Sequence, residues 1–231
     1  MRRPRKWLSA SGLLAGSIVP DFEYFLRMRK GFSYYSHTWP GLLWFDLPFA
    51  VLLTLLFHQV LRLPLLEHLP APLLARLVGI TPPAWLHVLK TRWAVVLLSI
   101  LIGVMTHFGW DWFVHQSSDY LYQRQNSLGT FDGWKTPIQL YNQLHLGHSL
   151  AGLVAIALAI YYLPVSPAVS ERNGSGLLFW LSVTLLTALI AGLRVALGTG
   201  LYLQDQLVAA LAAFLLALTL TCCGWQLAKK R

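Results

Sequence analysis

The sequence predicts an all-α, polytopic membrane protein, a helical bundle with five to six transmembrane helices. Hydrophobic residues make up 56% of the 231 positions and charged residues only 12%, against roughly 25% charged residues in soluble domains. The mean hydropathy is +0.54. A soluble domain of this length could not bury so much apolar surface, so we expect residues 1–231 to form a single integral membrane domain.

Six apolar segments are expected to form the helices, at about 7–19, 41–61, 93–115, 144–163, 177–197 and 206–227. The first segment is short and follows a basic start, which is also the plan of a cleaved signal peptide. The alternative is a short first helix with a packing face of small residues at Gly12 and Gly16. Between the segments we expect a short interfacial helix near 71–78 and a polar loop over 116–143.

The net charge of +9 comes from basic residues that cluster beside the apolar runs. Such clusters are typical of the cytoplasmic flanks of membrane helices, so we expect membrane lipids as partners and no nucleic acid. If the first segment spans, twelve Lys and Arg residues lie on the side of the termini and five on the other. If it does not span, the split is nine against eight. The clear bias favours six helices with both termini cytoplasmic.

Three ionisable residues recur every four positions at the end of the third segment, namely His107, Asp111 and His115. On a helix they fall on one stripe about 80° wide. His107 and Asp111 are about 6 Å apart along the axis, so both can reach one ion. His115 is about 12 Å from His107, which leaves it for a second ion, an acid–base role or the interface.

Other polar residues are expected at the same membrane face as this stripe. Asp21 and His37 precede the second helix, while His145 and His148 open the fourth. Because consecutive helices cross the membrane in opposite directions, these helix ends lie at one membrane face. In the preferred topology it is the outer face. Histidine and carboxylate side chains without cysteine suit zinc, manganese or iron(II).

Each residue also has a simpler interpretation that the sequence leaves open. Asp21 could cap a turn, and Glu23 could pair with Arg27 one helical turn away. His37 could be an interfacial residue, and Asp111 could be a buried partner of its neighbouring histidine with no metal present.

Three motifs give the chain its resemblance to a known family. They read Gly16-Ser-Ile-Val-Pro-Asp21-Phe-Glu-Tyr-Phe-Leu-Arg27-Met, Tyr35-Ser-His37-Thr and Gly103-Val-Met-Thr-His107-Phe-Gly-Trp-Asp111-Trp-Phe-Val-His115. With them the chain resembles, over nearly its whole length, the bacterial membrane family called domain of unknown function 4184. The resemblance implies a location in a bacterial inner membrane. More distantly it is similar to membrane-bound metal-dependent hydrolases, which share a Pro-Asp, a Ser-His or Thr-His and a Ser-His…Asp pattern.

The sequence departs from the family pattern at two places. Members usually begin with a segment carrying Ser-His-Pro, whereas this chain opens at its basic flank, so we expect a misassigned start or a lost ligand. The usual Gln-His followed by Ser and Gly appears as Gln143-Leu-His145-Leu-Gly-His148-Ser149 with Gly152. Either His145 or His148 could therefore be the equivalent histidine.

Together these observations favour a metal-dependent hydrolase of a membrane-associated substrate. Its divalent ion, zinc or manganese, is expected on four ligands: Asp21, His37, His107 and Asp111. One of His115, His145 and His148 is expected to serve as general acid–base. The alternative is a non-enzymatic membrane protein, such as a lipid-binding or assembly factor, whose His/Asp cluster is structural. No pair of spans is expected to be broken midway, which disfavours a transporter.

Overall fold

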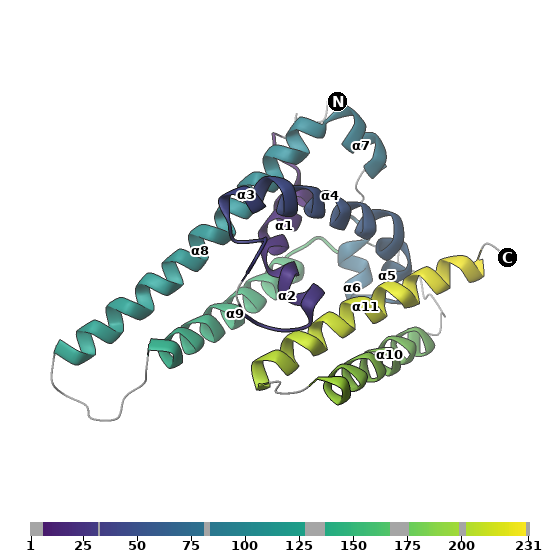
Figure 1. The fold of residues 1–231 in the computed structure, drawn as a ribbon. Helices are drawn as coiled ribbons and strands as arrows, with labels where there is room; N and C mark the ends of the chain where they lie inside the picture. The colour runs from purple at the N-terminus through teal and green to yellow at the C-terminus, as the bar shows by residue number, and fades with distance from the viewer. Residues whose placement is uncertain are drawn as a thin grey trace.

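The computed structural model describes residues 7–31, 33–80, 84–127, 137–166, 176–198 and 202–229. Within these ranges, side chains are described except at 115–127, 137–142 and 145. Every regular element in the described part of the chain is helical (Figure 1). The prediction of an all-helical chain is confirmed for these residues.

The elements follow one another along the chain as short helices first and long helices later. In order they are α1 (Ala10–Ile18), η1 (Val19–Asp21), α2 (Phe22–Arg27), α3 (Trp39–Gly41), η2 (Leu42–Asp46), α4 (Leu47–Leu56), η3 (Phe57–Leu61), α5 (Arg62–His68), α6 (Ala71–Leu77), α7 (Trp85–Thr91), α8 (Trp93–Ser127), α9 (Pro137–Tyr161), α10 (Gly176–Leu197) and α11 (Leu203–Lys229). The short element η1 is a 3₁₀ turn, whereas η2 and η3 are π-helical.

Four stretches among the described residues are long and apolar enough to cross a membrane. They are Trp39–His68, Trp93–Val114, Gly176–Leu197 and Leu203–Lys229. A fifth apolar stretch, Leu146–Tyr161, is shorter. These lengths and compositions make the chain a multi-pass membrane protein.

The first predicted span is not among these stretches. Helix α1 has nine residues, which rise about 14 Å, whereas the hydrocarbon core of a bilayer is about 30 Å thick. Because α1 cannot cross a bilayer by itself, the basic residues no longer favour one orientation of the chain. The outer-face orientation stays a prediction.

Two π-helical turns keep the second span continuous through its prolines. The turn η2 ends two residues before Pro48, and η3 ends three residues before Pro64. Proline lacks an amide donor and crowds the carbonyl four residues earlier. A π-turn widens the helix at such a point and is often found at functional sites.

The prediction of a polar loop over 116–143 is wrong over most of its length. Helix α8 continues to Ser127, and α9 already begins at Pro137. Figure 1 shows both helices extending away from the rest of the chain at this end. The polar residues indicate where α8 and α9 leave the apolar layer of the membrane. They do not end these helices, because the backbone hydrogen bonds remain within the helix. The short interfacial helix expected near 71–78 is α6.

Helix α1 lies at the centre of the molecule and packs against α8 and α4. Its contact with α8 is as close as backbone allows: a Cβ on Gly16 would overlap the carbonyl of Ile100, and one on Gly103 would overlap the carbonyl of Leu13. The small-residue face predicted for the first helix is therefore its contact with α8. A second cluster, around Phe179 and Cys222, joins α10 and α11.

Candidate metal centre

Helix α1 delivers Asp21 to the end of α8 that carries His107. The two helices run in the same direction, since Ser9 N donates to Ser99 Oγ at 2.8 Å and His107 Nδ1 lies 2.9 Å from the carbonyl of Ser17. The turn η1 continues α1 for three residues and ends at Asp21. The close contact of α1 with α8 thus brings Asp21 to the same place as His107.

Glu23 holds the loop that carries His37. Its carboxylate accepts hydrogen bonds from the backbone amides of Tyr34 (2.8 Å), Tyr35 (3.0 Å) and Ser36 (2.9 Å), and from Ser36 Oγ (2.9 Å). The side chain also pairs with Arg27 at 3.6 Å, as the spacing predicted. Glu23 is 2% exposed, so one buried carboxylate fixes three consecutive amides immediately before His37.

Stability is expected to depend on the ionisation of Glu23. Burial by itself would raise the pKa of Glu23, but the hydrogen bonds from Tyr34, Tyr35 and Ser36 outweigh it and hold the pKa below its ordinary value. A carboxyl group with a lowered pKa in the folded state stabilises the fold above its unfolded pKa, about 4.3, and this contribution is lost as the pH falls.

Thermal unfolding in detergent between pH 7 and pH 3 measures this contribution. The difference in melting temperature between the wild type and E23Q is expected to be largest at neutral pH and to shrink below about pH 4. A difference that stays constant over this range would contradict the ionised hydrogen-bonded carboxylate.

A left-handed backbone conformation turns His37 into the site. Its φ of 51° is unusual for a residue other than glycine, and such conformations concentrate at functional sites. The next residue, Thr38, caps α3 by accepting a hydrogen bond from Gly41 N at 3.0 Å. The loop held by Glu23 and the cap at Thr38 fix the backbone on both sides of His37.

The four residues predicted as metal ligands lie together at this point. His37 Nε2 is 3.3 Å from His107 Nε2, and Asp111 Oδ2 lies 3.5 Å from each of these nitrogens. Asp21 Oδ1 lies 3.9 Å from both. Asp21, His37 and His107 each offer one atom within 4.8 Å of the others, a spacing at which they could hold a metal ion.

The hydrogen bonds of the two imidazoles leave only acceptors at the centre. The Ser17 carbonyl can only accept, so His107 Nδ1 must carry its proton. Ser36 Oγ donates its proton to Glu23 and Ser33 Oγ donates to the Tyr24 hydroxyl, so His37 Nδ1, 3.1 Å from each serine oxygen, is also a donor. In neutral rings both Nε2 atoms then present lone pairs, beside two carboxylates. Such a group needs a cation or extra protons between its members.

Comparison with protein families supplies an independent observation. A family described as "Domain of unknown function (DUF4184)" matches residues 1–223. The chain belongs to this family. The curated proteins and the solved structures yield no match. The resemblance seen in the three sequence motifs is thus confirmed, and the match covers all four clustered residues of this DUF4184 chain.

The spacing of the ligand atoms fits a metal ion. Zinc–nitrogen distances of about 2.0–2.1 Å and zinc–oxygen distances of about 2.0–2.2 Å place neighbouring ligands of a tetrahedral ion roughly 3.3–3.5 Å apart. The shortest separations in the DUF4184 cluster are 3.3 and 3.5 Å. Each histidine also has a partner on Nδ1, which is the arrangement that orients metal-binding imidazoles. The side chains present therefore fit a divalent cation.

Of the three histidines predicted for acid–base chemistry, only His148 has a described side chain, and it lies outside the group of Asp21, His37 and His107. His148 packs instead against Trp110 and Phe113 of α8, with ring centroids 5.0 and 6.3 Å away. Its Nδ1 is buried and has no hydrogen-bond partner among the described residues. The backbones of His115 and His145 lie in α8 and α9, but their side chains are outside the described set.

The sequence interpretation missed the role of Glu23 in holding the His37 loop and did not single out the buried carboxyl of Asp46. Glu23 was paired with Arg27 alone, and its main partners are backbone amides, which no side-chain pattern reveals. Asp46 was not singled out, although it is the only acidic residue in the segment 41–61. A lone carboxyl group at membrane depth is itself a signal of function, so this residue could have been found.

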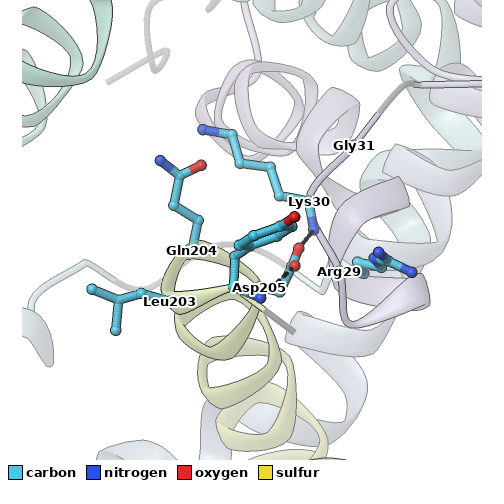
Figure 2. Close-up of a pocket in the computed structure, with 7 residues that line it drawn as sticks. Arg29, Lys30, Gly31, Leu203, Gln204 and Asp205 are labelled. Carbon is cyan, nitrogen blue, oxygen red and sulfur yellow. Dashed lines mark hydrogen bonds between the residues drawn. The ribbon is translucent and has the colours of Figure 1, made fainter. Parts of the chain in front are cut away.

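A second feature ties α2 to the start of α11. Asp205 is 4% exposed, and its carboxylate accepts hydrogen bonds from the backbone amides of Lys30 (3.0 Å) and Tyr202 (3.1 Å). Figure 2 shows this carboxylate turned toward the backbone of Lys30. Both residues line an open cavity of about 690 Å³. The cavity contains none of the predicted site residues, so we assign Asp205 the role of docking α2 onto α11.

Proposed function

We propose that this protein is a metal-dependent membrane hydrolase. Asp21, His37, His107 and Asp111 would hold a divalent cation, zinc or manganese, and the substrate would be membrane-associated. One observation carries the proposal: the Nε2 atoms of His37 and His107 lie 3.3 Å apart, and each is 3.5 Å from an Asp111 oxygen and 3.9 Å from an Asp21 oxygen. With neutral rings, the hydrogen bonds on Nδ1 leave both Nε2 atoms as acceptors toward a cation.

The chain's own residues supply the ligands and their orientation. When bound, a divalent cation supplies Lewis acidity, which polarises a substrate carbonyl or phosphoryl group and makes water more acidic. Hydrolysis also needs a group that moves a proton. The candidates for this acid–base role are still His115, His145 and His148. Of these, His148 has a described side chain, and its ring lies against Trp110, the residue before Asp111.

The exposure of the ligands favours this proposal over a purely structural cluster. The Asp21 side chain is 47% exposed and that of Asp111 is 29% exposed, whereas His107 is only 12% exposed. A hydrogen-bond network that served only packing would gain most from full burial. An open side lets a substrate reach the cation, as catalytic metal sites require. We propose that this open side faces the outer side of the membrane, an orientation that cysteine labelling from each side would test.

Metal analysis of the purified protein tests the site. We expect at least about one equivalent of zinc or manganese per chain, the minimum for one ion, and its loss in H107A. His87, an exposed histidine on α7, offers the matched control, because H87A should keep the metal. A wild type with clearly less than one equivalent, or an H107A protein that binds as much as wild type, would overturn the metal centre.

Activity of the metal-loaded protein tests the reaction. In liposomes, the wild type is expected to hydrolyse a phosphoester, amide or glycoside substrate, and this activity should disappear with a chelator and in H107A. A metal-bearing protein that is inert toward all three classes would retain the metal centre and refute the hydrolase. It would favour the alternative of a lipid-binding or assembly factor.

A further inference from the structure

The open cavity beside Asp205 lies where the turn after α2 meets the start of α11. It is lined by Arg29, Lys30 and Gly31 on one side of the chain and by residues 202–205 on the other. Figure 2 shows the side chains of Lys30 and Gln204 extending to the same side of Asp205, with Arg29 on its other side. Arg29 and Lys30 are both exposed, so two cations are accessible to a ligand in this cavity.

The acidic residue of the lining already has its partners. The Asp205 carboxylate accepts the backbone amides of Lys30 and Tyr202 at 3.0 and 3.1 Å, and the residue is 4% exposed. Arg29 forms no ion pair with any other described residue. The cavity therefore presents chiefly its two basic side chains, and the ligand that suits it is an anion.

The cavity stands at the polar end of a membrane span. The span Leu203–Lys229 begins with a residue of the lining, which places the cavity at the depth of the lipid headgroups. Tyr202, which precedes the span, is 77% exposed, and exposed tyrosine rings are typical of this depth. Anionic headgroups attract lysine and arginine there.

A row of exposed leucines leads from the cavity along α11. Leu203, Leu207 and Leu211 recur every four residues, so they share one face of the helix. They are 72%, 59% and 54% exposed. An acyl chain attached to a headgroup in the cavity can lie along this row, whereas a soluble phosphate compound has no use for it. The continuity of the basic cavity with the leucine row favours a lipid.

We propose that this cavity binds the phosphate group of an anionic phospholipid, with an acyl chain along the leucine row of α11. Arg29 and Lys30 would pair with the phosphate, and the Gln204 amide would donate a hydrogen bond to it. This lipid site goes beyond the metal centre proposed above and does not depend on it.

Binding of a labelled lipid to the full-length protein tests this site. In dodecyl maltoside micelles, phosphatidylglycerol with a fluorophore on one acyl chain is expected to bind at least about fivefold more tightly than phosphatidylcholine labelled in the same way. R29Q and K30Q should each raise the dissociation constant for phosphatidylglycerol about fivefold, and the double variant about 25-fold. The amide of residue 30 still donates to Asp205 in K30Q, which preserves the cavity wall.

Two further variants separate a shaped site from general positive charge. Q204A keeps the net charge but removes a hydrogen-bond donor, so it should weaken phosphatidylglycerol binding about fivefold. K90Q removes an exposed lysine of α7 outside the cavity and should bind as wild type does. All four positions are exposed, so every variant should melt at the temperature of the wild type.

Several results would overturn the inference. Wild-type binding of phosphatidylglycerol by R29Q/K30Q would refute the site, as would equal binding of the two lipids by the wild type. A loss in K90Q as large as that in K30Q, or an unchanged Q204A, would show general electrostatic attraction in place of a shaped site. Displacement of the labelled lipid by glycerol phosphate as readily as by unlabelled phosphatidylglycerol would assign the cavity to a soluble phosphate and refute the lipid.

Discussion

The substitution Glu23→Gln is expected to weaken divalent-metal binding by about 10–100-fold, the usual effect of removing a partner that orients a ligand. The carboxylate fixes the amides of Tyr34, Tyr35 and Ser36 and receives the proton of Ser36 Oγ. A glutamine amide replaces one acceptor oxygen by a donor, which would face an amide N–H. His37 then loses its backbone support and one of its two hydroxyl partners on Nδ1, that of Ser36, while Ser33 Oγ remains.

Titration with zinc or manganese, followed by metal analysis, measures this effect. Glu67→Gln is the matched control, since Glu67 pairs with the exposed Lys229 at the surface. Such pairs contribute about 0–1 kcal/mol, so E67Q should bind metal as wild type does. Wild-type affinity in E23Q would show that the loop keeps its conformation without the carboxylate.

The substitution Gly16→Val is expected to destabilise the folded protein by about 3 kcal/mol and to abolish metal binding. A Cβ at Gly16 would overlap the backbone carbonyl of Ile100, and backbone cannot move aside as a side chain can. Helix α1 would have to separate from α8. Asp21, which follows α1, would then move away from His107.

Unfolding in detergent and metal analysis check this prediction, with Gly192→Val as control. Gly192 also lies inside a helix, but a Cβ there would meet nothing within 4 Å. G192V should change stability by no more than helix propensity, a few tenths of a kcal/mol. A G16V protein with wild-type stability would mean that α1 and α8 can separate at no cost.

Much of the site could be predicted from the sequence, because helical spacing and membrane threading are simple geometric constraints. The four-residue step placed Asp111 beside His107, and alternation across the membrane brought Asp21 and His37 to the same end. Neither constraint says which of His115, His145 and His148 turns toward that end. This depends on how α9 packs on α8, and His148 in fact lies against Trp110 and Phe113.

The sequence was less informative about features that depend on backbone hydrogen bonds, such as loop conformation and the ends of helices. The importance of Glu23 comes from three amides that any residue types could have supplied. The start of the first helix was predicted three residues too early, because the apolar run begins at Trp7 whereas α1 begins at Ala10. The opposite error occurred after His115, where polarity was taken as the end of a helix that continues to Ser127.

The contact between His37 and His107 joins positions 70 residues apart in the chain. A cation held by both rings would therefore be a cross-link that closes a large loop, comparable in its effect on the unfolded chain to a disulfide. Metal loading and folding would then be linked, because a bound ion would fasten the loop that carries His37 to α8 and global unfolding would release it.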